Sequence, residues 1–524
     1  MRRHFLPILF LIGFSLFTLR SIFNPGFMYS HDSLWHVERL QNMYSLIPLQ
    51  FPVRWSPSLD NGYGIPLFNF TYPAPYYLGS LFMISGLGPI KAYDLLLLSF
   101  YILGGVGIYF LASKKPWIGI SAAVLYLTTP YQFLDIFVRG ALGEVVALGL
   151  FPFVLLSFKQ VAESGKLKWY SPLPFALLLL SHNFYGYLFA ALLIFFIIFI
   201  YEHKKTLIIS LFLSLCLSSF FLIPAFFEKS LLLYSQIDHL DFRNHFVYFS
   251  QLIYSKWSYF GSLPGLDPRE MSYQLGLGNI LILLLAIMLV KKSRQLAIYL
   301  FVVFVAIFMM LPISDFFWRY IPLLSSIQFP WRFLGVVTVI FPLIYLETIS
   351  LLLHKPRYSW IKYLPLLIVA IAIYGARNYA RPVKWMTGDE FTSLHYEYVG
   401  KTTTAQRSEI VPKWATVERY TAGNLPELKS GELSSYTVKP YEISFQVDSA
   451  EQQNLIINRN YYPSWVGKID GQPLSLTPTQ TGEISVPISV GSHTYEISYA
   501  STIWAKLGNV ISLVSLLLIL ILVY

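Results

Sequence analysis

Long apolar stretches recur along the whole chain, and they restrict its possible folds more than any other feature. A helix needs roughly 20 mostly apolar residues to cross the hydrocarbon core of a bilayer. With a hydrophobic fraction of 55%, 13% charged residues and a mean hydropathy of +0.55, the pattern predicts a polytopic α-helical membrane protein. The predicted spans are 5–23, 92–112, 117–134, 141–158, 170–182, 184–201, 207–226, 276–290, 295–313, 331–353, 363–376 and 503–524.

Clusters of lysine and arginine set the predicted orientation, because such clusters near span ends stay preferentially in the cytoplasm. With the N-terminus inside, the clusters that fall on the cytoplasmic side are "MRRH", "SKKP", "KQVAESGKLK", "EHKK", "KKSR" and "HKPRYSWIK". The net charge of +10 is therefore explained by topology and not by nucleic-acid binding. We expect a protein of the cytoplasmic membrane whose first apolar stretch is a retained signal anchor. Cys216 is the only cysteine, so a disulfide framework is excluded.

The stretch 76–90, "YYLGSLFMISGLGPI", fits this scheme poorly. It is apolar but short and rich in glycine, and a full span here would place Lys114 and Lys115 outside. We expect it to be re-entrant or interfacial, with a thirteen-span arrangement as the alternative. Non-helical backbone at that depth is tolerated where protein or water covers it.

The predicted orientation leaves three sizeable outer segments, 24–75, 227–275 and 377–501. In the last, runs such as "YEISFQV" and "SHTYEISYA" alternate apolar and polar residues, and Asp470-Gly471 separates two runs as a type I′ hairpin turn does. We therefore expect three parts: a transmembrane module over 1–376, an extracytoplasmic β-sandwich over 377–501, and a C-terminal transmembrane helix over 502–524.

Ionisable residues gather in the first outer segment and at the predicted outer span ends. Such groups are costly at membrane depth and usually mark a functional site. They are Asp32, His36, Glu38, Arg139, Glu144, His182, Arg319 and Arg332.

In "SHDSLWHVERL", Asp32 and His36 are four residues apart and share one face of a helix that begins near Ser33. Asp32 is the candidate general base, and His36 orients it or shares a divalent metal with it. The alternatives are that Asp32 only caps the helix and that His36 is a partly buried interfacial residue. His31 and His36 are five apart, which is not the zincin spacing.

Arginine suits phosphate, because its planar guanidinium donates paired hydrogen bonds. "FVRGALGE" places Arg139 and Glu144 at outer span ends, where Arg139 either binds phosphate or forms an ion pair with Glu144 that closes the loop. In "SIQFPWRFLG", Arg332 is the stronger phosphate candidate and Trp331 is an interfacial anchor. The turn "SHNFYG" presents His182 to the same outer vestibule.

The stretch 52–79 is dense in aromatic residues and prolines. Aromatic faces suit sugar rings and polyprenyl chains, and prolines keep the loop extended. An interfacial aromatic belt is the alternative. Candidate substrate contacts here are Arg54, Asp60 and Tyr72.

Several of these motifs together resemble a known family. "SHDSLWH", "RWSPSLDNGYGIPLFNFTYP", "RGALGE", "QFPWRFLG" and "YYPSWVGKIDGQPL" are similar to the YfhO-like and 6-pyruvoyl-tetrahydropterin synthase-related bacterial membrane proteins, which are grouped with GT-C glycosyltransferases. The resemblance covers nearly the whole chain, although no soluble synthase domain is visible. It implies a GT-C-like fold, a polyprenyl-phosphate sugar donor and an acidic base in the first outer loop, which carries over onto Asp32. Such loops commonly hold two carboxylates, whereas here the next acid after Asp32 is Glu38. The resemblance therefore does not decide whether the site binds a divalent metal.

These observations predict an inverting glycosyltransferase that acts at the outer face. Asp32 takes the proton from an acceptor hydroxyl on a glycan, lipid or protein, and Arg332 with Arg139 neutralises the departing lipid phosphate. The alternatives are a lipid-linked glycan flippase or other transporter, and a membrane-anchored carbohydrate-binding protein. Charges grouped towards one face and a large outer domain favour the transferase.

Overall fold

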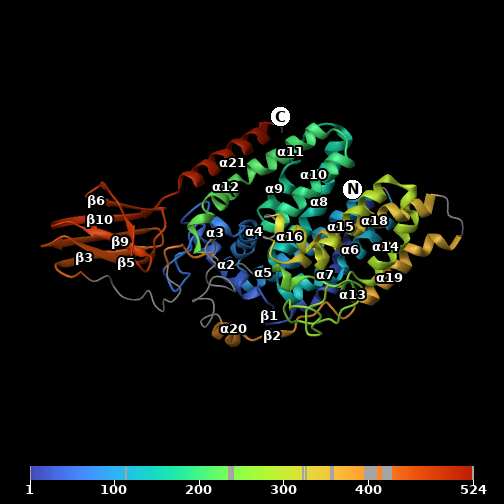
Figure 1. The fold of residues 1–524 in the computed structure, drawn as a ribbon, viewed down its shortest axis with the longest axis horizontal. Helices are drawn as coiled ribbons and strands as arrows, with labels where there is room; N and C mark the ends of the chain where they lie inside the picture. The colour runs from blue at the N-terminus through green and yellow to red at the C-terminus, as the bar shows by residue number, and fades with distance from the viewer. Residues whose placement is uncertain are drawn as a thin grey trace.

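The computed structural model describes residues 2–112, 115–233, 241–321, 324, 327–354, 359–394, 410–415 and 428–521. A helical bundle carries a β-domain at one end (Figure 1). Each predicted span is helical. The corresponding helices are α1 (Arg2–Thr18), α5 (Pro89–Leu111), α6 (Pro116–Leu127), α8 (Leu142–Ser164), α9 (Leu173–Leu179), α10 (Asn183–Phe199), α11 (Lys204–Leu217), α12 (Ser219–Phe227), α14 (Leu277–Leu289), α15 (Arg294–Met310), α18 (Phe333–His354), α19 (Leu364–Ala376) and α21 (Ile503–Ile521).

Most of these helices are shorter than the apolar stretches that predicted them, whereas α5 and α8, with 23 residues each, are longer. Among the described residues, five helices are long and apolar enough to cross a membrane, or seven if each of two bent pairs forms one span. One bent pair is α11 with α12, at 70°, and the other is α15 with Pro312–Tyr320, at 88°. Several other predicted spans form helices that are too short, and turns interrupt some of them. In the predicted span 170–182, for example, the helix α9 has only seven residues, since a turn separates it from α10.

The stretch 76–90 forms most of a short helix, α4 (Ala74–Ile84). Its eleven residues are about 16 Å long, half of what a bilayer core requires. The helix packs closely on its neighbours, because a Cβ at Gly79 would lie 2.5 Å from Leu40 and 2.8 Å from Leu96. Those leucines belong to α2 (Ser33–Leu46) and α5. An apolar helix too short to cross, packed on α2 and α5 and with Leu81 and Ile84 exposed, agrees with the prediction that this stretch is not a full span.

The three predicted outer segments meet on one side of the bundle. The strand β1 (Phe27–Tyr29) pairs antiparallel with β2 (Lys384–Met386). His31 Nε2 lies 3.0 Å from the carbonyl oxygen of Tyr259, and the N–H of Leu233 donates to Val411 over 2.9 Å. These contacts bring the three segments together at one side of the bundle.

The β-domain is a sandwich of two antiparallel sheets. One has the order β3-β4-β10-β6-β7 and the other β5-β9-β8, and their inward side chains form one core. The hairpin turn at Asp470-Gly471 is confirmed, with φ of 46° and 80°. The strands are β3 (Glu432–Lys439), β4 (Glu442–Ser449), β5 (Gln453–Asn460), β6 (Trp465–Ile469), β7 (Gln472–Leu474), β8 (Thr477–Pro478), β9 (Glu483–Ile488) and β10 (Gly491–Tyr499).

The predicted start of this domain at 377 is wrong. Residues 377–394 pack on the helical bundle through β2 and α20 (Gly388–Leu394), at the lower edge of Figure 1. Within the described residues, the sandwich begins near 428. The sequence alone does not show that β2 belongs to the bundle, because its partner strand β1 lies more than 350 residues earlier in the chain.

The first loop contributes a side chain to the sandwich core. Trp55 is fully buried, and its ring contacts Tyr462, Trp465 and Tyr499 at centroid distances of 6.2, 5.6 and 5.3 Å. The C-terminal helix α21 then leaves the domain and runs along α11 and α12 (Figure 1). The β-domain is therefore connected to the bundle through its core and through the helix that follows its last strand.

Candidate functional site

Asp32 stands at the start of α2, but its carboxylate does not cap the helix. The residue occupies the N-cap position without a side-chain capping hydrogen bond. Among the described residues, no hydrogen bond or ion pair reaches that carboxylate, which is partly exposed. Its backbone N–H donates to the carbonyl oxygen of Arg139 over 2.8 Å, and the N–H of His31 donates to Val138 over 3.0 Å. The capping alternative is therefore wrong, and the side chain stays available for chemistry.

His36 lies one turn further along α2 and is buried. Its Nδ1 lies 2.9 Å from the hydroxyl of Tyr76, and its ring stacks near Tyr76 and Tyr93. Burial lowers the pKa of His36 well below its usual value, and the positive charge of Arg39 adds to that effect. His36 is therefore neutral at pH 7 and acts here as a buried packing residue.

The described residues contain no group of three or more His, Cys, Asp or Glu side chains that could hold a metal ion. The predicted pair of metal ligands, Asp32 and His36, has only two members, and one nitrogen of His36 already faces Tyr76. We therefore derive no step through a metal.

Arg39 completes the polar face of α2 and is a residue that the sequence analysis missed. It follows Asp32 and His36 at the i, i+4, i+7 spacing that places side chains on one helical face. Its Nη1 lies 3.5 Å from the Tyr76 hydroxyl, and its charge acts on Tyr72, Tyr76 and His36. The spacing itself was a signal in the sequence.

Glu144 is the centre of a buried ion cluster beside this face. It lies in the first turn of α8, where the helix dipole favours a negative charge. Its Oε1 accepts from Arg139 Nη2 over 2.7 Å, and its Oε2 accepts from the hydroxyl of Tyr131 over 2.8 Å. The second amino group of Arg139 donates to Asp135 over 2.6 Å. The predicted Arg139–Glu144 ion pair is confirmed, within a larger network.

Two further cluster members come from distant helices. His182 is the N-cap of α10; its Nδ1 accepts from the N–H of Tyr185, and its Nε2 lies 3.6 Å from Glu144. Arg332 directly precedes α18, and its Nε lies 3.4 Å from the same carboxylate oxygen. His182 and Arg332, from separate segments of the chain, thus meet at Glu144, as expected for residues of one vestibule.

Aromatic rings enclose both guanidinium groups. Arg139 lies over the ring of Trp331 at 4.5 Å, and Arg332 lies over Phe184 at 4.4 Å and Phe329 at 4.9 Å. Guanidinium groups are attracted to ring faces, most strongly when water is excluded. Trp331 itself is buried, so its predicted role as an interfacial anchor is wrong.

The charges of this cluster balance internally. Two buried carboxylates, Asp135 and Glu144, face two buried guanidinium groups, Arg139 and Arg332. A phosphate would therefore have to compete with Glu144 for either arginine. Asp135 was not among the predicted site residues, although an acid inside an apolar run is itself a signal of a buried ionic partner.

Tyr72 lies between the α2 face and the ion cluster. Its ring stacks with Tyr76 at 6.1 Å and lies 5.4 Å from the ring of His182. Burial raises the pKa of Tyr72 well above its usual value, and the negative charges of Asp32 and Glu144 add to that rise. The phenol is therefore within electrostatic reach of both carboxylates, as expected for a residue of the predicted vestibule.

Two predicted contacts from the first loop have structural roles instead. Arg54 is buried and donates to Asn69, to the carbonyl of Phe220 and to Asn509, which joins the loop to α12 and α21. Asp60 is buried and accepts from Asn460 of the β-domain over 2.9 Å. Local sequence patterns do not reveal these partners, which lie up to 455 residues away in the chain.

Two other predicted residues also lie away from the cluster. Glu38 accepts from Asn42 over 2.6 Å on α2. Arg319 forms an ion pair with Asp315 on the half-exposed helix α16 (Asp315–Tyr320). The site consists of Asp32, His36, Arg39, Tyr72, Tyr76, Asp135, Arg139, Glu144, His182 and Arg332.

Comparison with known families covers most of this site. The 6-pyruvoyl-tetrahydropterin synthase related domain, described as a membrane protein, matches residues 68–383, about three fifths of the chain. The chain belongs to this family. The family match includes Tyr72 and the whole ion cluster, and begins after Asp32 and the rest of the α2 face. None of the curated proteins matches the chain.

Proposed function

We propose that this membrane protein is a glycosyltransferase that moves a sugar from a polyprenyl-phosphate donor to an acceptor hydroxyl, with inversion, on the extracytoplasmic face. The observation that carries the proposal is the carboxylate of Asp32. It is partly exposed, has no hydrogen-bond partner among the described residues, and begins a helix whose backbone is fixed to the ion cluster.

In the proposed reaction, the Asp32 carboxylate accepts the proton of the acceptor hydroxyl as the hydroxyl oxygen attacks the anomeric carbon. The bond between that carbon and the phosphate oxygen breaks, and its electron pair leaves on the lipid phosphate. General-base assistance of this kind contributes about 10² to 10⁴-fold in rate. The lipid phosphate of the donor is itself the leaving group, so the reaction requires no nucleotide.

Arg39 replaces Arg332 in this proposal as the cation that faces the departing phosphate. Arg39 shares the helical face of the base, is partly exposed, and its Nη1 lies 3.5 Å from the hydroxyl of Tyr76. Its positive charge acts on the tyrosines that Asp32 also affects. A fixed cation at the developing negative charge stabilises the transition state.

The positions of the charges support transfer over transport. Glu144 lies in the first turn of α8, His182 caps α10 and Arg332 directly precedes α18, so all three stand at helix ends. A transporter generally binds its substrate near the bilayer midplane, between broken helices. The grouping at helix ends fits a site that opens on one side.

The experiment is to incubate the purified full chain with a panel of polyprenyl-phosphate sugars and a mixture of glycan, lipid and protein acceptors. The proposal predicts that one donor releases its lipid phosphate in proportion to sugar transferred. Vesicle-reconstituted protein that moves a lipid-linked sugar between leaflets without breaking it would instead support a flippase.

A further inference from the structure

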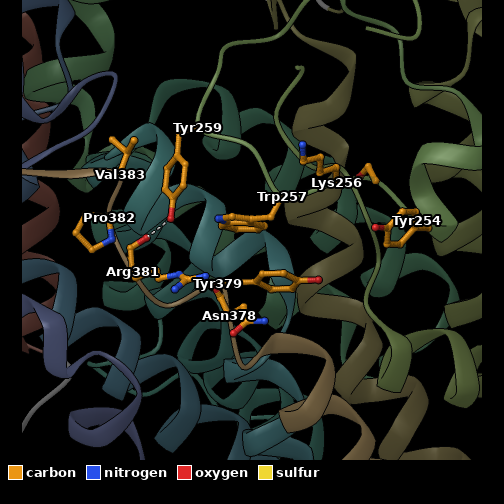
Figure 2. Close-up of a pocket in the computed structure, with 10 residues that line it drawn as sticks. Tyr254, Lys256, Trp257, Tyr259, Asn378, Tyr379, Arg381, Pro382 and Val383 are labelled. Atoms are coloured by element: carbon orange, nitrogen blue, oxygen red, sulfur yellow. Dashed lines mark hydrogen bonds between the residues drawn. The ribbon is translucent and has the colours of Figure 1, made fainter. Parts of the chain in front are cut away.

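A pocket of about 590 Å³ opens beside the candidate site. One wall comes from residues 254–259 in the second predicted outer segment, and the other from residues 378–383, which follow α19. Figure 2 shows the two walls facing each other, with the rings of Trp257 and Tyr379 between them. The proposed function does not use this pocket.

The charge of the pocket is positive. Lys256 and Arg381 are its charged lining residues, and no carboxylate stands among the residues that line it. Both side chains are exposed, and Arg381 donates its Nε to the carbonyl of Asn378 over 3.2 Å, which leaves its terminal amino groups for a ligand. Cationic lining residues without an opposing acid favour an anionic ligand.

The aromatic walls are fixed in place. The rings of Trp257 and Tyr379 are parallel, with centroids 4.3 Å apart and an angle of 14°. Gln274 donates to the hydroxyl of Tyr379 over 2.8 Å, and the hydroxyl of Tyr259 donates to the carbonyl of Arg381. A rigid, flat aromatic surface is suited to the apolar face of a sugar ring.

The indole N–H of Trp257 is the decisive group. It is buried and has no hydrogen-bond partner among the described residues. In Figure 2 it points towards Tyr259 and the Arg381 side of the pocket. Buried donors are nearly always paired, so this one predicts an acceptor atom on a bound ligand.

We propose that this pocket binds a sugar ring that carries an anionic group, such as a phosphate or a carboxylate. The ring lies against the aromatic wall, Lys256 and Arg381 bind the anion, and the indole N–H of Trp257 donates to an oxygen of the ligand.

The pocket also adjoins the candidate base, since the carbonyl oxygen of Tyr259 lies 3.0 Å from Nε2 of His31, the residue before Asp32. If the proposed function holds, the ligand is the acceptor glycan; this assignment of a role rests on that function, whereas the binding itself does not.

The test is calorimetric titration of the full chain in detergent with glucose 6-phosphate, glucose and inorganic phosphate. We expect saturable binding of glucose 6-phosphate that is tighter than binding of either part alone. K256A/R381A should weaken it by about tenfold or more, since charge-assisted hydrogen bonds are lost. W257F keeps an aromatic ring without the N–H and should weaken it by a smaller factor. K384A, an exposed lysine outside the pocket, is the matched control and should leave binding unchanged.

Three results would overturn the proposal: no saturable binding, equal binding of phosphate alone, or full binding by K256A/R381A. Displacement by phosphatidylglycerol in nanodiscs would assign the pocket to a lipid headgroup and so would also overturn it. Because this titration requires no donor and no turnover, saturable binding without transfer would remove only the proposed function. Sugar transfer without saturable binding of glucose 6-phosphate would overturn only the proposed role of this pocket.

Discussion

The backbone N–H of Asp32 donates to the carbonyl oxygen of Arg139 over 2.8 Å, which connects the candidate base to the buried ion cluster. Arg139 is held in turn by Asp135 and Glu144. The cluster therefore acts as a rigid support that positions the start of α2. This relationship explains why so many buried charges surround a site that uses only a few of them.

Replacing Glu144 with Gln should destabilise the protein by about 3 to 5 kcal/mol, because Arg139 and Arg332 would then share one carboxylate in a buried environment. Chemical unfolding in detergent measures this free energy. D267N is the matched control, since Asp267 forms a surface ion pair with Arg269 whose loss should leave stability nearly unchanged. Equal stability of E144Q and D267N would contradict the structural role of the cluster.

Replacing Trp55 with Ala should loosen the β-domain, although the residue belongs to the first loop. Loss of a fully buried tryptophan costs about 3 to 5 kcal/mol. Limited proteolysis should show faster cleavage within the sandwich strands. F51A is the control, because Phe51 is 78% exposed and its loss should change neither cleavage nor stability. A sandwich as resistant in W55A as in the wild type would show that the loop does not complete its core.

Replacing Gly335 with Ala should disturb the cluster from the side of α18. An added Cβ would lie 2.1 Å from the hydroxyl of Tyr185, which bonds Tyr131 and the carbonyl oxygen of Arg332. The shift this requires should cost about 1 to 3 kcal/mol and lower the melting temperature. G13A adds the same methyl group where no atom lies within 4 Å, and should melt like the wild type. Identical melting of both variants would argue against the close packing of α10 on α18.

His36 should make stability depend on pH. Burial lowers its pKa well below 6.5 in the folded state, so below pH 6.5 the unfolded chain binds more protons than the folded one. Its contribution to stability is complete above pH 6.5 and is lost as the pH falls, by at most about 1.4 kcal/mol per pH unit.

Comparing the free energy of unfolding of H36Q with that of the wild type between pH 7.5 and 5 measures this contribution. The stability of H36Q should depend less on pH than that of the wild type. His493, at the surface of the β-domain, is the control, because its hydrogen bond with Asp470 raises its pKa and its replacement should act weakly and in the opposite direction. A pH profile of H36Q that matches the wild type would contradict the burial of a neutral His36.

Local patterns in the sequence predicted much of this fold. Apolar stretches marked a helix at each predicted span, and alternation with Asp470-Gly471 marked the hairpin of the sandwich. Basic clusters predicted that three segments lie together, and the contacts His31–Tyr259 and Leu233–Val411 bring them together. These features depend on residues close together in the chain, where periodicity and turn chemistry are informative.

Long-range partners explain what the sequence did not predict. Trp55 packs into strands 400 residues later, and Arg54 reaches α21, so neither role leaves a local pattern. Arg332 was a sound candidate for a site, but only its distance to Glu144 shows that its charge is already balanced. Helix breaks depend on tertiary packing, so apolar length overestimated the full spans.

The most direct test of the account is the rate of lipid-phosphate release by D32N with the donor identified from the panel. The account predicts that release falls by about 10² to 10⁴-fold, because the amide cannot accept the proton, while stability and donor binding stay near wild type. D267N, which removes an exposed carboxylate from the second predicted outer segment, should keep full activity. Release by D32N at a rate close to the wild type would contradict the account.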